Sequence, residues 1–220
     1  MIAVVDYQKG NLKSAERGLI AAGGEALITA DASEIAKADA IVLPGVGAFA
    51  DAAATMCELG QMEAIRDRVR AGVPFLGICL GEHLMFEHGV EGAPEGNPAC
   101  GLGLLPGTVV AMPRCDAQGK AFKVPHVGWN TIEMPACNGS ELAFACPLFD
   151  GIAPGEYFYF THSFIAPTGS HTIAETTHST RFTSAVQFGE CAFGVQFHPE
   201  KSSDAGARVL ANFVAIAARG

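Results

Sequence analysis

The chain has 220 residues, of which 49% are hydrophobic and 17% are charged, and its formal net charge is -9. This composition can bury a substantial core and excludes an intrinsically disordered chain. The acidic balance, with no local cluster of lysine and arginine to reverse it, argues against nucleic acid as a partner. We therefore expect one folded domain over residues 1–220.

The start of the chain and the cysteines indicate where the protein works. The first apolar run is too short for a signal peptide, and no stretch approaches the roughly 18 apolar residues of a membrane helix. The cysteines have irregular spacing, with neither a disulfide framework nor a Cys-x-x-Cys zinc pair. We expect a cytoplasmic protein without metal or cofactor. The cysteines are Cys57, Cys79, Cys100, Cys115, Cys137, Cys146 and Cys191.

The first half of the chain alternates strand and helix patterns. Apolar runs predict strands at 2–5, 26–29, 40–43 and 73–78. Helical spacing predicts helices at 12–22, at about 50–71 and from near Leu80 onward. Strands that alternate with helices indicate a parallel sheet, with catalytic groups at the carboxyl ends of its strands.

The second half has a different pattern, with strands following one another. Strands are predicted at 102–112, 157–165, 171–176, 183–188 and 192–197, and a last helix is predicted after Ser203. Residues 89–101 are the best loop candidate. The expected fold class is therefore α/β, with a central, mostly parallel sheet flanked by helices and additional antiparallel strands in the second half.

The most informative segment is Gly77-Ile78-Cys79-Leu80-Gly81, between a predicted strand and a predicted helix. A Gly-x-nucleophile-x-Gly turn strains the central residue and exposes its side chain at the edge of the sheet. The helix dipole there favours a thiolate, and the N–H of Leu80 is the expected oxyanion donor. A buried structural cysteine is the commoner role of this residue type. The flanking glycines favour the nucleophile, and the other cysteines lack such a context.

His198 and Glu200 follow the last predicted strand, separated by Pro199. In an extended segment, residues two apart point the same way. Glu200 would therefore orient the imidazole of His198, which would take the thiol proton of Cys79. The alternative is a strand-end histidine paired with a nearby acid, and the presence of the elbow favours catalysis.

These residues resemble the class I (triad) glutamine amidotransferases, which have a flavodoxin-like fold. Further segments make the chain similar to one subfamily, the glutaminase subunits of imidazole glycerol phosphate synthase, and the resemblance covers essentially the whole chain. The segments are Asp6-Tyr7, Gly10-Asn11-Leu12-x-Ser14, Leu43-Pro44-Gly45-Val46-Gly47-Ala48-Phe49, Pro125-His126-Val127-Gly128-Trp129-Asn130, Tyr159-Phe160-Thr161-His162-Ser163-Phe164 and residues 194–202.

The resemblance implies hydrolysis of glutamine through a γ-glutamyl thioester on Cys79. Ammonia would pass to a (β/α)8-barrel cyclase subunit in a heterodimer of histidine biosynthesis. Gly45 and Val46 match the second oxyanion donor, which a peptide flip permitted by glycine would form. The residues that match substrate-binding positions are Gly47, His83, Thr161, His162, Ser163 and Phe164. The residues that match the partner interface are Asn11, Trp129, Asn130 and Lys201.

One departure from the family pattern follows the elbow. The family usually has Met-Gln there, whereas this chain has Glu82-His83. The family glutamine is expected to help hold the substrate, and a histidine differs from it in geometry and charge. We therefore expect the affinity for glutamine to weaken as His83 titrates, and replacement of His83 by glutamine to remove this effect.

Two alternative functions are compatible with parts of this sequence. The chain could be the glutaminase of a different amidotransferase, although Gly128-Trp129-Asn130 favours the histidine pathway. It could also be a redox-sensing protein of similar fold that uses Cys79, but such a protein would not need Glu200 beside His198.

Overall fold

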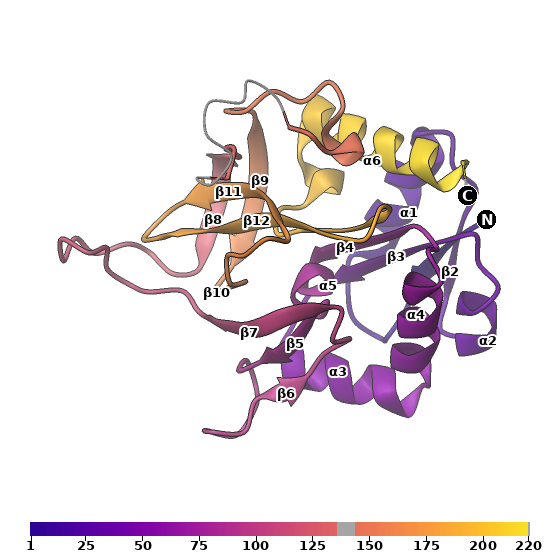
Figure 1. Ribbon diagram of the computed structural model, residues 1–220, viewed down its shortest axis with the longest axis horizontal. Helices are drawn as coiled ribbons and strands as arrows, with labels where there is room; N and C mark the ends of the chain where they lie inside the picture. Colours follow the sequence, from indigo (N-terminus) through magenta and orange to yellow (C-terminus); the bar gives the residue numbers. More distant parts are fainter. Residues whose placement is uncertain (136–143, 220) are drawn as a thin grey trace.

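The computed structural model describes residues 1–135 and 144–219. A seven-stranded sheet runs through it in the order β11-β12-β13-β4-β3-β1-β2 (Figure 1). From β13 to β2 neighbouring strands are parallel, whereas β11 and β12 extend the sheet antiparallel at one edge. The strands are β1 (Ile2–Val5), β2 (Ala26–Thr29), β3 (Ala40–Gly45), β4 (Phe75–Cys79), β11 (Thr172–Thr177), β12 (Arg181–Phe188) and β13 (Ala192–Val195).

Helices cover both faces of this sheet (Figure 1). α1 (Leu12–Ala21) and α6 (Ser203–Ala217) pack together on one face, where their apolar side chains join Ile2 and Val4 in one core. α2 (Ala32–Ile35), α3 (Phe49–Glu58) and α4 (Gln61–Arg70) share the other core with Ala3 and Val5. Because successive strand residues point to opposite faces, the continuous apolar run of β1 is buried on both sides.

The single helix predicted at about 50–71 is wrong, because the structure has α3 and α4 there. The break lies at Gly60, whose φ of 70° is left-handed and cannot continue a right-handed helix. Both helices bury an apolar face, so their sequence periodicity gives little sign of the interruption. The short α2 was not predicted; its start is capped by Asp31, whose carboxylate accepts from the N–H of Ser33.

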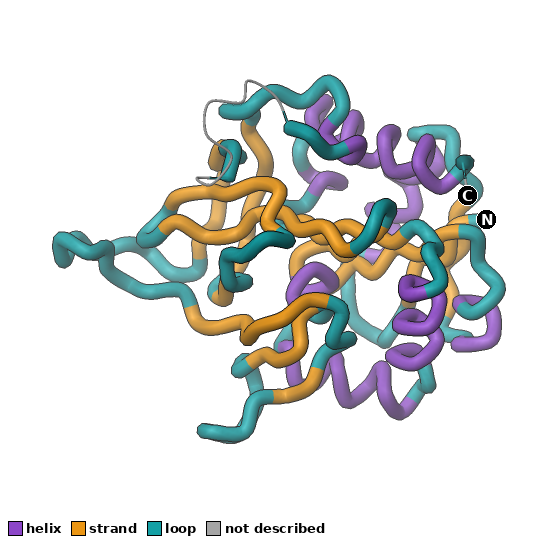
Figure 2. The backbone as a smooth tube through the Cα atoms, in the orientation of Figure 1, coloured by secondary structure: helices purple, strands orange, loops and turns teal. Residues whose placement is uncertain are grey.

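Two smaller sheets lie on the side to which β4 and the following helix α5 (Leu80–His83) lead (Figures 1 and 2). One is a four-stranded sheet in the order β10-β7-β5-β6, and the other is the antiparallel pair β8-β9. Their strands are β5 (Phe86–Gly89), β6 (Ala99–Cys100), β7 (Leu105–Ala111), β8 (His126–Thr131), β9 (Tyr157–His162) and β10 (Phe164–Ile165).

The sequence predicted these smaller sheets only in part. The strand expected at 157–165 is divided at Ser163 into β9 and β10, which belong to different sheets. The strands β5 and β8 were not predicted, because β5 is short and both contain glycine and polar residues. The loop expected at 89–101 is wrong at its end, because Ala99 and Cys100 form β6 by pairing with β5. Cys137 lies outside the described residues. Within the described residues, no helix is long and apolar enough to cross a membrane.

Candidate active site

The predicted turn between β4 and α5 is confirmed. Cys79 ends β4 with φ 55° and ψ −106°, a backbone conformation that a residue with a side chain rarely adopts. A Cβ on Gly77 would lie 2.4 Å from the carbonyl oxygen of Gly81, and one on Gly81 would lie 1.9 Å from that of Leu43. Only glycine fits at these two positions, so the pattern in the sequence has a steric cause.

The sheet brings His198 to the nucleophile. β13 pairs with β4 in parallel, with Val195 opposite Ile78, so the chain leaves β13 beside Cys79. The Nδ1 of His198 lies 2.9 Å from Oε1 of Glu200, and both side chains are buried. The Nε2 of His198 has no partner with full hydrogen-bond geometry among the described residues, and the imidazole interacts with the side chain of Cys79.

The charge state of His198 follows from these two neighbours. Burial lowers its pKa, but the interactions with Cys79 and with Glu200 outweigh burial and raise the pKa to about 9. The predicted extended arrangement of these residues is wrong in detail, because Pro199 starts the 3-10 turn η3 (Pro199–Lys201). The turn still carries the carboxylate of Glu200 to the imidazole. The three residues predicted as catalytic therefore lie together.

The sulfur has two further polar neighbours. It lies 3.9 Å from the carbonyl oxygen of Thr161 and 3.7 Å from Nε2 of Gln196. Gln196 was not singled out in the sequence, although its position two residues before His198 on a strand end indicates the same face. Its Oε1 lies 2.7 Å from Nε2 of His83.

A cavity of about 190 Å³ opens beside the sulfur. Every residue predicted for the oxyanion hole or the substrate lines it except Gly45, and Glu91 joins them. The lining residues are Val46, Gly47, Cys79, Leu80, His83, Glu91, Thr161, His162, Ser163 and Phe164.

Glu91 gives the cavity an acidic group that the sequence did not reveal. It lies in the segment predicted as a loop, and its carbonyl oxygen accepts from the N–H of Ala50 at 3.0 Å. Burial raises the pKa of its carboxyl group, against a hydrogen bond from the N–H of Phe49 that lowers it. Only the packing of this loop on the start of α3 places Glu91 at the cavity.

The two predicted oxyanion donors are in different states. Leu80 is the first residue of α5, where the backbone N–H has no partner within the helix. The N–H of Val46 instead interacts with the hydroxyl of Tyr7, although its geometry falls short of a full hydrogen bond. Gly45 continues β3 without a positive φ, and a Cβ there would lie 2.6 Å from the Tyr7 hydroxyl. Close packing, rather than unusual torsion, requires glycine at 45 in this conformation.

His83 lines the cavity, but its Nε2 is engaged by Gln196. Burial lowers the pKa of His83 to about 4, although the bond to Gln196 partly opposes this. The side chain is therefore neutral at physiological pH. Glu82 is the other residue at which this chain differs from the family pattern. It lies on α5 and is fully buried, and neither of its carboxylate oxygens has a hydrogen-bond partner in the described part of the chain. Burial and the nearby Cys79 raise the pKa of Glu82 well above its usual range.

His162 belongs to a hydrogen-bonded chain behind the cavity. Its Nδ1 donates to the carbonyl of Phe164 at 2.8 Å, and its Nε2 lies 3.0 Å from Nδ1 of His126. The Nε2 of His126 lies 3.3 Å from the amide of Asn130. Burial is the main cause that lowers the pKa of both histidines, so each is neutral and carries one ring proton. This chain fixes the wall of the cavity.

The residues predicted at a partner interface divide into two groups. Trp129 is half-exposed on β8, and its ring packs edge-on against the ring of Tyr159. The Nζ of Lys201 lies 5.9 Å from the centre of the Tyr159 ring. Asn130 alternates to the other side of β8, where it donates to Thr177 at 3.0 Å. Asn11 stands at the start of α1, which packs against η3.

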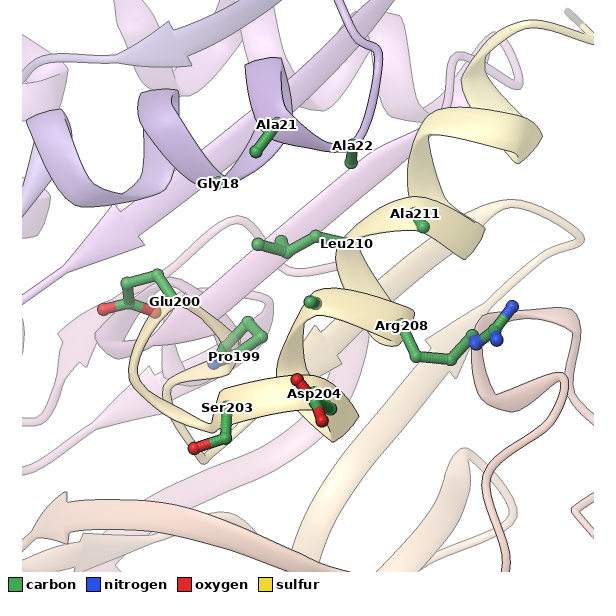
Figure 3. Close-up of a pocket in the computed structure, with 11 residues that line it drawn as sticks. Gly18, Ala21, Ala22, Pro199, Glu200, Ser203, Asp204, Arg208, Leu210 and Ala211 are labelled. Carbon is green, nitrogen blue, oxygen red and sulfur yellow. The ribbon is translucent and has the colours of Figure 1, made fainter.

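A larger cavity, of about 490 Å³, lies between α1, α6 and η3 (Figure 3). It is lined by alanine and glycine of α1 and by Leu210, Arg208 and Asp204 of α6. It contains no cysteine, and Glu200 is its only contribution from the catalytic group. The smaller cavity, beside Cys79, is therefore the candidate active site, because the nucleophile lines it. Within residues 1–135 and 144–219, no group of three or more His, Cys, Asp or Glu side chains could hold a metal ion.

The site has the parts of a cysteine-dependent acyl-transfer enzyme on an α/β sheet. They are a cysteine on a strained elbow, a buried imidazole paired with a carboxylate, and an adjacent helix N-terminus. The family model described as "Glutamine amidotransferase class-I" matches residues 3–217. The chain belongs to this family.

Curated relatives narrow the similarity. The chain is 43% identical over 214 residues to the "Imidazole glycerol phosphate synthase subunit HisH" of Moorella thermoacetica, covering 96% of this chain and 93% of that protein. It is 42% identical to the protein of the same name from Rhodopirellula baltica, covering 97% and 96%. The name describes one subunit of a larger enzyme, so these relatives work with a partner subunit.

Solved structures agree on the fold. A structure described as "Crystal structure of glutamine amidotransferase" has a TM-score of 0.70 and 20% identity, covering 99% of this chain and 100% of that one. "Structure of PurLQS from Thermotoga maritima" has a TM-score of 0.68 and 17% identity, covering 97% of each chain. The predicted fold class is therefore confirmed.

Proposed function

We propose that residues 1–220 work as one glutaminase domain, the glutamine-hydrolysing subunit of an imidazole glycerol phosphate synthase. The observation that carries the proposal is the buried His198–Glu200 pair at the sulfur of Cys79, beside a cavity of about 190 Å³. The similarity to HisH proteins over nearly the whole chain supports the choice of pathway. Glutamine hydrolysis needs no cofactor, and these side chains supply its nucleophile, its base and the group that orients the base.

The chemistry begins at the sulfur. His198 takes the proton of Cys79, and the thiolate attacks the γ-carbonyl carbon of glutamine. The tetrahedral intermediate collapses as the leaving amide nitrogen takes the proton from His198 and departs as ammonia. Water then attacks the thioester, with His198 as base, and releases glutamate and the free thiol. Glu200 keeps the imidazole in the tautomer that presents Nε2 to the sulfur.

Glutamine enters as a zwitterion, and the cavity suits it. Glu91 supplies negative charge for the α-ammonium group. The backbone of residues 161–164 forms the opposite wall and is fixed by the hydrogen-bonded chain from His162 to Asn130. The N–H of Leu80 is one oxyanion donor.

The second oxyanion donor requires a change of conformation. The N–H of Val46 faces the hydroxyl of Tyr7, so the peptide between Gly45 and Val46 must turn before this N–H can reach the substrate oxygen. Val46 is also exposed at the cavity. We propose that docking of the partner subunit favours the turned state, so that ammonia is released only when an acceptor is present.

The partner we propose is a (β/α)8-barrel cyclase that receives the ammonia, in the cytoplasm. An apolar face on β8 and β9 supports a docking site, because exposed large apolar side chains gather there. Val127, Trp129 and Tyr157 are each about half-exposed, and Lys201 lies at the edge of the same face. The positions of Asn11 and Asn130 as interface residues stay predictions.

The test is to measure glutamate formation with and without the barrel subunit and its nucleotide substrate. We expect little turnover by the chain alone and a strong increase in the complex. Cys79→Ala should abolish glutamine-dependent synthesis and spare synthesis from ammonium salt. Cys57→Ala, at an exposed cysteine of α3, is the matched control. Full activity of Cys79→Ala with glutamine would reject the proposed mechanism, and peroxide reactivity without turnover would favour the redox-sensing alternative.

A further inference from the structure

Two buried side chains outside the triad form a hydrogen-bonded path to the nucleophile. Gln196 is completely buried and His83 is 3% exposed, so neither bond competes with bulk water. The Nε2 of His83 lies 2.7 Å from Oε1 of Gln196, and Nε2 of Gln196 lies 3.7 Å from the sulfur of Cys79. A sulfur at 3.7 Å is within the longer range of N–H···S contacts.

The protonation states give this path a direction. An ionised sulfur can only accept a hydrogen bond, so the amide nitrogen of Gln196 must face Cys79 when the thiolate forms. The Oε1 of Gln196 then faces His83 and needs a donor. Burial keeps His83 neutral, with a pKa of about 4, so its ring has one proton, which must be on Nε2.

We propose that Gln196 and His83 are a positioning pair for the nucleophile: the amide of Gln196 holds the sulfur of Cys79 and stabilises its negative charge, and His83 fixes the orientation of that amide. The inference deepens the proposed glutaminase function and rests on it for its effect on turnover. Neither residue exchanges a proton with the substrate. Their effect is on the fraction of time that the sulfur is ionised and aimed at the cavity.

Other titratable groups near the sulfur come from several elements. Tyr7 follows β1, Glu82 is on α5 and His198 follows β13, and each interacts with Cys79. Glu91 and His162 line the same cavity. Substitutions at Gln196 and His83 leave all five in place. A change in the pH profile of Cys79 in such variants therefore reports the missing amide hydrogen bond.

The experiment measures alkylation of Cys79 by iodoacetamide between pH 5 and 10, in the full chain without glutamine, followed by peptide mass spectrometry. Mass spectrometry separates Cys79 from the exposed cysteines. In Gln196→Leu we expect the pH of half-maximal alkylation to rise by about one unit, because one hydrogen bond to the charged sulfur is lost. His83→Met should shift it in the same direction by less. His83→Gln should restore the wild-type profile, because its amide can donate to Oε1 of Gln196.

Turnover in the complex with the partner subunit gives the second measurement. We expect Gln196→Leu to lower kcat for glutamine about tenfold with KM changed by less than about twofold. Gln187→Leu is the matched control, since it makes the same chemical change on β12, where the amide donates to Gly189 instead. Synthesis from ammonium salt should stay unchanged in every variant.

The proposal is overturned if Gln196→Leu has the same alkylation profile as wild type. It is also overturned if His83→Met and His83→Gln share one profile and that profile differs from wild type. If Gln196→Leu does not fold, the contrast between the two His83 variants decides. Alkylation needs no glutamine, so these results stand apart from the proposed function. Absence of glutamine turnover by the wild-type complex would reject that function alone.

Discussion

Two histidines belong to the active site, His198 beside Cys79 and His83 bonded to Gln196, and they are almost completely buried, at 2% exposed for His198 and 3% for His83. Their pKa values are nevertheless shifted in opposite directions. The pKa of His198 is raised to about 9, whereas that of His83 is lowered to about 4. His198 faces the carboxylate of Glu200 and the sulfur, which favour its charged form. The hydrogen-bond partner of Nε2 of His83 is a neutral amide, so burial prevails.

Because both rings are buried, the difference in charge between these two histidines follows from their partners. A stabilised charged form suits His198, which takes the proton of Cys79 and returns it to the leaving group. The neutral form suits His83, which donates one hydrogen bond of fixed direction.

Glu200→Gln should reduce the difference in pKa between the two histidines. Without the carboxylate, the pKa of His198 loses one of the causes that raise it and falls below about 9. We expect kcat to fall by about 10²- to 10⁴-fold, as for the loss of an orienting acid in other triads, and the alkaline limb of the pH profile to move to lower pH. Steady-state glutamate release between pH 6 and 10 measures both. Glu190→Gln, at an exposed site, should match wild type, and a Glu200→Gln enzyme of normal rate would remove Glu200 from the mechanism.

Glu82 provides the case of a buried acid with no compensating partner in the described residues. Its pKa is raised in the folded state, so the folded chain holds a proton that the unfolded chain releases as pH rises above about 4.5. This group therefore reduces stability as pH increases toward 8. Glu82→Met should raise the free energy of unfolding at pH 7 by about 1–3 kcal/mol and make it less dependent on pH.

Urea unfolding at pH 5 and pH 8 measures this effect. Glu58→Met, at the exposed end of α3, is the control for a change of charge alone. An unfolding free energy that does not increase in Glu82→Met would mean that the carboxyl group has a partner in solution.

His83 should affect glutamine binding only in acid. The low pKa moves the expected loss of affinity to about pH 4, so protonation of His83 should raise KM for glutamine by less than about twofold down to pH 4.5 and severalfold only near pH 3.5. His83→Gln should flatten the acid part of this profile while Glu91 still titrates. Measuring KM from pH 3.5 to 8 in both proteins checks this, and a change centred near pH 6.5 would show that His83 is not held neutral by burial.

Tyr7→Phe should have the smallest effect. Removal of the hydroxyl frees the N–H of Val46 to turn toward the cavity, while the ring still fills the core. We expect glutaminase activity of the chain without its partner to rise about two- to fivefold, as expected for one weak hydrogen bond. Stimulation by the partner should fall by the same factor. Tyr157→Phe, an exposed tyrosine of β9, serves as the control for activity without the partner. Unchanged basal activity in Tyr7→Phe would separate this hydroxyl from the oxyanion hole.

The sequence alone determined the features that depend on local sterics and on short-range pattern. The glycines around Cys79 indicate the elbow, because any Cβ at 77 or 81 would clash with backbone atoms. The apolar runs indicate β1, β3 and β4 because a strand covered on both faces must be apolar throughout. The order of the characteristic segments was sufficient to identify the family, and the fold followed from the family.

The tertiary structure decided what depends on contacts between distant parts of the chain. Glu91 reaches the cavity because its loop packs on the start of α3, and Gln196 meets His83 because β13 lies beside β4. The charge of each histidine is also a tertiary property, since it follows from which groups are brought to a buried ring. The carboxylate beside His198 comes from Glu200, two residues along the chain, and the sequence predicted it. Folding alone brings the sulfur to His198 and the amide of Gln196 to His83.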